Sequence, residues 1–98
     1  MTHEEFWSLY ESGKIKVKFF TYENPDADNG ELASGEVDAY QHDGKFYLRI
    51  SQNTAPKGYR RRYRNGGWSW ATIKEFPTAA AANAYFKKAF PLYKLTTM

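Results

Sequence analysis

The chain contains no cysteine among its 98 residues. Disulfide bridges, thiolate metal sites and cysteine nucleophiles are therefore excluded. It also lacks a run of about 20 apolar residues, which a membrane-spanning helix needs, so no membrane partner is expected. Met1 is followed by polar and acidic residues rather than by the basic start and apolar stretch of a secretion signal. These absences predict a cytoplasmic protein.

Histidine is scarce, and the groups that usually perform catalysis are scarce with it. The two histidines, His3 and His42, lie in no metal-ligand spacing and beside no nucleophile motif. Glu36 and Asp38 form a carboxylate pair on one face of a predicted strand, but Arg49 is expected opposite Asp38. We therefore expect no enzymatic activity, no cofactor and no metal site.

Acidic and polar residues fill the segment Glu23–Glu31. Its pattern Asn24-x-Asp26-x-Asp28 resembles a calcium-binding loop. Such a loop needs glycine at its sixth position and glutamate at its twelfth, where this chain has Asn29 and Gly35. We interpret the segment as a polar surface turn whose acids meet a basic partner or the chain's own arginines.

Apolar, aromatic and charged residues are all present in the proportions of a folded protein. Hydrophobic residues make up 42%, aromatic residues 18% and charged residues 26% of the sequence. This composition excludes a disordered tail and predicts a single domain over residues 1–98.

The charge is divided unevenly. Residues 1–42 have a net charge of −6 and residues 43–98 of +9, which sum to the overall +3. Such a division indicates a charged partner, self-association, or one half neutralising the other.

Local patterns at the start of the chain predict a helix and then a strand. Thr2 and Glu5 have the spacing of a capping box, and Gly13 is suited to end the helix. Apolar and basic residues alternate over Lys14–Phe19, which predicts a half-buried strand. The inward-facing residues of this strand are Ile15, Val17 and Phe19.

A hairpin is predicted around the turn Asp43-Gly44. One face pairs Gln41 with Phe46, Ala39 with Leu48, and Val37 with Ile50. The other face pairs Tyr40 with Tyr47 and Asp38 with Arg49. Apolar pairs on one face, with an aromatic pair and an ion pair on the other, support this register.

A second helix is predicted near the C-terminus. Pro77 and Thr78 are typical of a helix start, and Pro91 ends the helix at about Phe90. Its packed face contains Ala82, Tyr85, Phe86 and Ala89. Helix, strand, two hairpins and helix together predict an α+β fold, with an antiparallel sheet of about five strands packed by an N-terminal and a C-terminal helix.

The second hairpin, Tyr59–Trp70 with its turn at Asn65-Gly66, combines positive charge with aromatic rings. Two packings are open. Burying the tyrosines and tryptophans hides the larger apolar area, and this places Arg60, Arg62 and Arg64 on the open face, each about 6.8 Å from the next. If Ala71 and Ile73 face inward instead, the aromatic rings are exposed together with Arg61. The candidate binding residues are Lys45, Arg49, Lys57, Arg60, Arg61, Arg62, Arg64, Trp68 and Trp70.

Residues 45–92 resemble the three-stranded-sheet DNA-binding domains of the AP2 type and of integrase arm-binding modules. The similar features are Gly44-Lys45-Phe46-Tyr47-Leu48-Arg49-Ile50, the arginine strand, the tryptophan strand, and Phe76-x-Thr78 leading into Ala82, Ala84 and Tyr85. In those families the sheet enters the major groove. The resemblance implies DNA contacts for Arg49, Arg60, Arg62, Arg64, Trp68 and Trp70.

Two functions are consistent with this sequence. The first is binding of nucleic acid, because arginine side chains bind phosphate and aromatic rings stack on bases. The second is a small protein-binding inhibitor or adaptor, of the kind that mobile elements encode. It would engage a partner through the arginine and aromatic face or through its acidic half. An acidic half lying beside the basic face would favour the second, because it would repel DNA.

Overall fold

The computed structural model describes residues 1–28, 30–55 and 71–96. These residues form α1 (His3–Glu11), β1 (Lys18–Glu23), β2 (Leu32–His42), β3 (Lys45–Thr54), β4 (Ala71–Phe76), α3 (Ala79–Ala89) and β5 (Lys94–Leu95). The five strands make one antiparallel sheet in the order β4-β3-β2-β1-β5. The predicted α+β class is confirmed. Within the described ranges, no helix has the length and apolar character needed to cross a bilayer.

The β2–β3 hairpin has the predicted register. Asp43 and Gly44 both adopt positive φ angles, of 51° and 73°, as a type I′ turn requires. Every predicted pair from Gln41 with Phe46 to Val37 with Ile50 is present, and Asp38 lies opposite Arg49. The turn therefore determines which residues reach each face.

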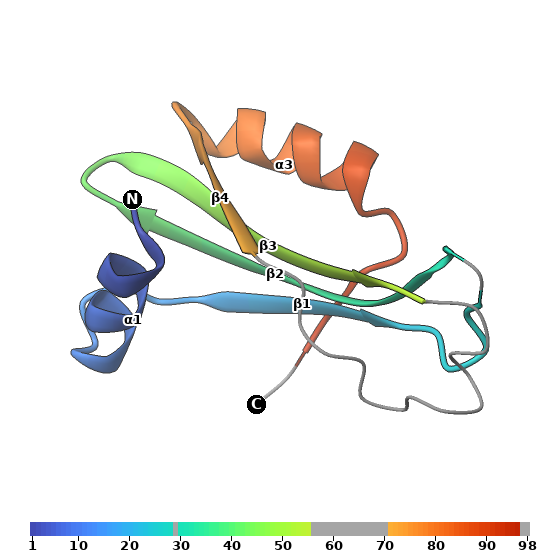
Figure 1. The fold of residues 1–98 in the computed structure, drawn as a ribbon. Coiled ribbons are helices and arrows are strands. Elements are labelled where there is room, and N and C mark those ends of the chain that lie inside the picture. The colour runs from blue at the N-terminus through green and yellow to red at the C-terminus, as the bar shows by residue number, and fades with distance from the viewer. Residues whose placement is uncertain (29, 56–70, 97–98) are drawn as a thin grey trace.

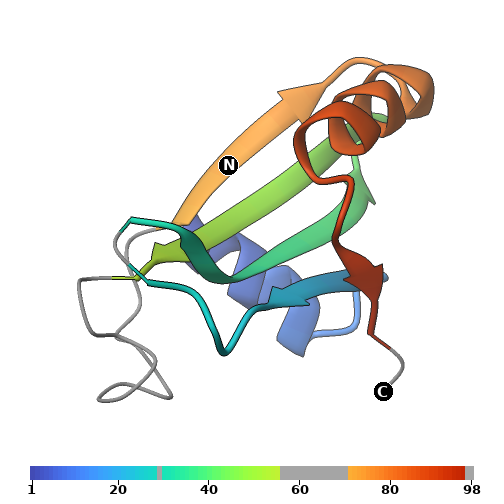
Figure 2. The ribbon, with the colours of Figure 1, turned by 90° about the vertical axis from the view of Figure 1, so that its right-hand side faces the viewer.

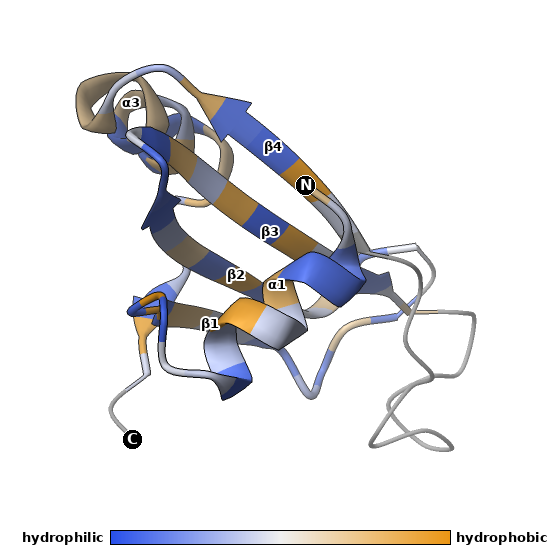
Figure 3. Ribbon diagram, turned by 90° about the vertical axis from the view of Figure 1, so that its left-hand side faces the viewer, coloured by the Kyte–Doolittle hydropathy of each residue, from blue (hydrophilic) through white to orange (hydrophobic). Residues whose placement is uncertain are grey.

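The two helices cover opposite faces of the sheet, as Figures 1 and 2 show. On the α3 face, Val37 and Leu48 pack with Phe90 and Tyr93. On the α1 face the buried residues are Phe6, Ile15, Tyr40 and Tyr47. Figure 3 shows α1 lying across this second face. Because both faces are covered, the aromatic pair and the ion pair of the hairpin belong to the interior.

Both helices begin with the predicted caps. Thr2 and Glu5 form the complete capping box of α1, and Gly13 follows with a φ of 73°. Thr78 caps α3 through a bond from the Ala81 amide to its hydroxyl, and Phe90 ends the helix as predicted. Ala89 was wrongly placed on the packed face: it is exposed. At this end of α3 the larger ring of Phe90 is buried instead, with 4% of its surface exposed.

Two strand predictions need correction. The first strand begins at Lys18, whereas the prediction was Lys14–Phe19. Ile15 is buried as expected, but it packs in the cluster around Phe6 while the chain returns from α1 to the sheet. Strand β5 was not predicted. It has only two residues, and they pair with Phe20 and Thr21, which are distant in the sequence. No local sequence pattern therefore indicates this strand.

Gly35 in β2 allows a close approach between the sheet and Tyr93 of the C-terminal segment. A Cβ atom at this position would overlap the hydroxyl of Tyr93 and lie 2.8 Å from its Cζ and 3.1 Å from the Ser51 carbonyl oxygen. Tyr93 is itself buried and stacks on Tyr22 with ring centroids 5.6 Å apart. The ring therefore has little room to move away.

We expect Gly35→Ala to lower the free energy of unfolding by about 1–3 kcal/mol, because the added methyl group overpacks this contact. Urea unfolding followed by circular dichroism measures the change. Adding Tyr93→Phe to this variant removes the overlapping hydroxyl and should recover part of the loss. A Gly35→Ala protein as stable as the wild type would show that Tyr93 does not hold this position.

Candidate functional site

The structure describes two of the nine predicted binding residues, Lys45 and Arg49. The other seven lie outside the described residues: Lys57, Arg60, Arg61, Arg62, Arg64, Trp68 and Trp70. The Asn65-Gly66 turn also lies outside the described residues. The two described residues both lie on β3 and both face the side of the sheet that α1 covers.

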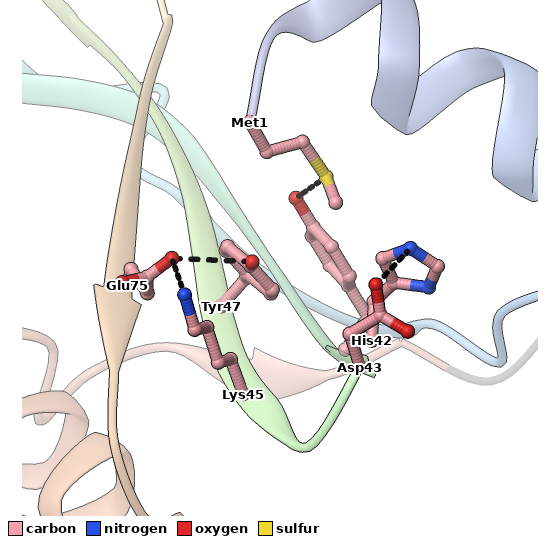
Figure 4. Close-up of polar contacts among 7 residues, drawn as sticks. Met1, His42, Asp43, Lys45, Tyr47 and Glu75 are labelled. Atoms are coloured by element: carbon pink, nitrogen blue, oxygen red, sulfur yellow. Dashed lines mark hydrogen bonds and ion pairs between the residues drawn. The ribbon is translucent and has the colours of Figure 1, made fainter.

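Lys45 lies at the start of β3 and has an acidic partner on the neighbouring strand. Its Nζ is 3.6 Å from Glu75 Oε1, and the Tyr47 hydroxyl donates a 3.2 Å hydrogen bond to the same oxygen (Figure 4). About half of each charged side chain is exposed, 55% for Lys45 and 50% for Glu75. An ion pair this exposed contributes little to stability, and it competes only weakly with another anion.

Arg49 is enclosed between the sheet and α1, with 15% of its side chain exposed. Its Nη1 donates a 2.9 Å hydrogen bond to Asp38 Oδ2, and its Nε donates a 3.2 Å bond to His3 Nδ1. The guanidinium carbon lies 5.0 Å from the ring centroid of Phe6 and 5.1 Å from that of Trp7. Arg49 thus joins α1 to the sheet, and its contact with nucleic acid stays a prediction.

Asp38 is the ionisable side chain buried most deeply in this region. It is fully buried, and its Oδ1 has no hydrogen-bond partner in the described part of the chain. Burial raises the pKa of Asp38 to about 7, and the neighbouring Glu36 carboxyl raises it too, whereas Arg49 lowers it. The carboxylate pair that the sequence predicted is therefore present beside Arg49.

The aromatic cover of Arg49 was not predicted from the sequence. Nothing local in the sequence indicates that Phe6 and Trp7 of α1 enclose an arginine on β3. His3, which lies in no metal-ligand spacing, is an acceptor for that arginine. These contacts depend on how α1 lies on the sheet, which the α1 sequence does not encode by itself.

The acidic segment Glu23–Glu31 lies at the end of the sheet where the basic segment begins. Ala55, the last described residue before that segment, accepts a hydrogen bond from the Gly30 amide and donates a 2.8 Å bond to the Glu31 carbonyl. Leu32 pairs with Thr54, and β4 resumes at Ala71 opposite Ser51. The acidic loop therefore lies at the end of the sheet where β3 ends and β4 begins.

Strand β4 tests part of the predicted packing of the second hairpin. In the packing that buries the tyrosines and tryptophans, Ile73 faces outward, on the same face as Arg60, Arg62 and Arg64. In the structure Ile73 is partly buried and packs against the cluster around Phe6. That face is therefore covered at Ile73, because α1 and the β2–β3 hairpin place their aromatic rings there.

The acidic side chains gather no metal site in the described ranges, where no group of three or more histidine, aspartate or glutamate residues is arranged to hold an ion. In the segment that resembles a calcium loop, the Asn24 side-chain oxygen accepts a bond from the Asp26 amide, as in an ordinary turn. No family model matches the chain, and neither a curated protein nor a solved structure matches it significantly.

Proposed function

We propose that this chain is a non-catalytic binding module that binds nucleic acid through the basic, aromatic segment Tyr59–Trp70. The observation that supports the proposal is the position of this segment between β3 and β4. These two strands pair with each other, so the chain enters and leaves the segment from neighbouring strands of the sheet.

The charge and the rings of this segment suit a polyanion. Lys45 and Arg49 each have an acidic partner, so the proposal depends on the five cations of the sequence between Lys57 and Arg64. Guanidinium groups bind phosphate in a bidentate manner, and tryptophan rings stack on unpaired bases. The resemblance to sheet-based DNA-binding domains agrees with this proposal.

Fluorescence anisotropy of labelled duplex and single-stranded oligonucleotides, titrated at two salt concentrations, tests the proposal. We expect binding that weakens with salt, and an affinity at least tenfold lower after Arg60, Arg62 and Arg64 are changed to alanine. Each lost phosphate contact reduces the slope of log affinity against log salt by about 0.9 for duplex DNA, so the slope should fall by roughly 2 to 3.

The chain offers a matched control for this triple variant. Lys14, Lys16 and Lys18 are also three cations at alternating positions, and all three are exposed. Changing them to alanine removes the same charge from the other half of the molecule. Equal losses of affinity in the two triple variants would refute a specific role for the basic segment.

Binding of a protein partner is the second candidate, and the acidic segment supports it. Glu23 and Asp26 are exposed at the end of the sheet where the basic segment begins. Charges within a Debye length of about 8 Å repel phosphate at physiological salt, whereas a protein surface of mixed charge would complement them.

The variant Glu23→Gln with Asp26→Asn distinguishes the two functions. If nucleic acid binds at this end of the sheet, removing the two negative charges should raise its affinity severalfold. The second candidate is supported by a different pair of results. Neither oligonucleotide binds, and the wild type captures a protein that neither the arginine variant nor this variant captures. A pull-down without a specific partner would count against it.

A further inference from the structure

Charged and titratable side chains, of which Asp38 is fully buried, lie at the contact between α1 and the sheet. We call Glu36, Asp38, Arg49 and His3 the Arg49 cluster. Asp38 is fully buried, and its Oδ1 has no hydrogen-bond donor among the described residues. A buried acceptor without a donor is unfavourable. A proton on Asp38 removes this cost, because a protonated carboxyl donates a hydrogen bond and the neighbouring Glu36 carboxyl accepts it.

The charge balance of the Arg49 cluster changes with one proton. When the two carboxyls hold one proton between them, their single negative charge balances the guanidinium of Arg49. When that proton is lost, two carboxylates face one guanidinium. Arg49 Nε also donates a hydrogen bond to His3 Nδ1.

The same cluster holds α1 in place. Arg49 reaches from β3 between the rings of Phe6 and Trp7, and it bonds to His3 on the first turn of the helix. The Tyr40 hydroxyl adds a 3.0 Å hydrogen bond to the Met1 sulfur (Figure 4). A change in the charge around Arg49 therefore acts directly on the contact between α1 and the sheet.

We propose that the Arg49 cluster is a pH-sensitive contact, which holds α1 firmly on the sheet when Asp38 is protonated and loosens it when Asp38 is ionised. Ionisation leaves an unbalanced negative charge beneath a helix whose first turn carries Glu4 and Glu5. This device is independent of the nucleic-acid proposal, because none of its groups lies in the basic segment.

The direction follows from the shift of the Asp38 pKa, from 3.8 to about 7. A carboxyl whose pKa is raised by folding binds its proton more tightly in the folded state. Its protonated form therefore supports folding below the unfolded pKa, and this support is lost as the pH rises through the folded pKa. Thus α1 is held most firmly below about pH 3.8, and this support is lost as the pH rises through about 7.

Other charged and titratable groups surround Asp38 on the packed elements. On β1, uncharged Phe19 lies opposite it. The groups to consider are Glu36 and Tyr40 on β2, Tyr47 and Arg49 on β3, and His3 and Glu5 on α1. Burial raises the pKa of both tyrosines, so they stay neutral through this range. Glu36 and His3 are the groups that the experiment must separate from Asp38.

Trp7 reports on α1, because it lies on that helix against Arg49 with 42% of its surface exposed. In a Trp68→Phe, Trp70→Phe background it is the remaining tryptophan. We expect its emission to shift to longer wavelength as the pH rises through about 7. Asp38→Asn should abolish the shift, Glu36→Gln should move its midpoint to lower pH, and His42→Gln should leave it unchanged.

Three outcomes would overturn the proposal. The transition could persist in Asp38→Asn, or it could be absent from the parent variant. It could also be lost in His3→Gln although Asp38 still titrates normally. Amide hydrogen exchange on the unmodified chain covers the case in which the tryptophan variants do not fold. After correction for intrinsic rates, protection of α1 should fall between pH 6 and pH 9 while that of α3 stays the same. Equal behaviour of the two helices would also contradict it.

Discussion

Changing Arg49 to methionine should lower the free energy of unfolding by about 3–5 kcal/mol at pH 9, the range measured when one partner of a buried ion pair is removed. The reason is that Asp38 is fully buried and Arg49 is the cation that balances it. At pH 9 the wild-type Asp38 is ionised, because its pKa is about 7. The variant must then either bury a lone carboxylate or take up a proton against the solution pH.

The loss should be clearly smaller at pH 5, where Asp38 is protonated in both proteins. Adding Asp38→Asn to the variant should restore most of the stability at pH 9, because the uncompensated charge is then gone. Urea unfolding at the two pH values measures these differences. Lys45→Met is a matched control: it removes another cation from the same face of β3, but its exposed pair with Glu75 contributes only about 0–1 kcal/mol. Equal losses for the two cations would contradict the buried role of Arg49.

Phe6→Ala should cost about 3–5 kcal/mol, the usual range for removing a buried phenyl ring. Phe6 is fully buried, and its ring centroid lies 5.0 Å from that of Tyr40 and 5.0 Å from that of Trp7. It also forms one face of the enclosure around Arg49. Its loss therefore opens a cavity and exposes a buried charge at the same time.

Chemical unfolding and the amide exchange of α1 both report on this change. Leu92→Ala is the control, because it removes a large apolar side chain that is 66% exposed and should alter stability by no more than about 0.5 kcal/mol. If Phe6→Ala unfolds at the same urea concentration as Leu92→Ala, then α1 contributes nothing to the fold.

The parts of the fold that local chemistry determines could be predicted from the sequence. The capping box at Thr2 and the turn at Asp43-Gly44 each depend on residues a few positions apart. Pairing residues outward from this turn places Asp38 opposite Arg49, and no tertiary contact is needed to predict it. The enclosure of Arg49 by Phe6 and Trp7 could not be predicted in this way, because α1 and β3 are distant in the sequence and the docking angle of a helix is a tertiary property.

The role of Arg49 shows why a candidate site is harder to predict than a strand register. Sequence reasoning identified both the Asp38 pair and a basic surface, and it included Arg49 in each. The structure places the side chain in the interior, where the carboxylate, an imidazole and two rings surround it. The net charge of a segment includes every arginine, whether its guanidinium faces the solvent or the interior. It therefore does not show which arginines form a binding surface.

The position of β5 has a consequence for the order of folding. This last strand pairs with β1, the first strand, and the core beneath α3 needs Phe90 and Tyr93 from the same C-terminal stretch. Neither contact exists until residues beyond 90 have left the ribosome. The β2–β3 hairpin can form during synthesis, but its α3 face stays exposed to water until translation of this region is complete. The nascent chain thus passes through a stage in which Val37 and Leu48 are available to chaperones or to other chains.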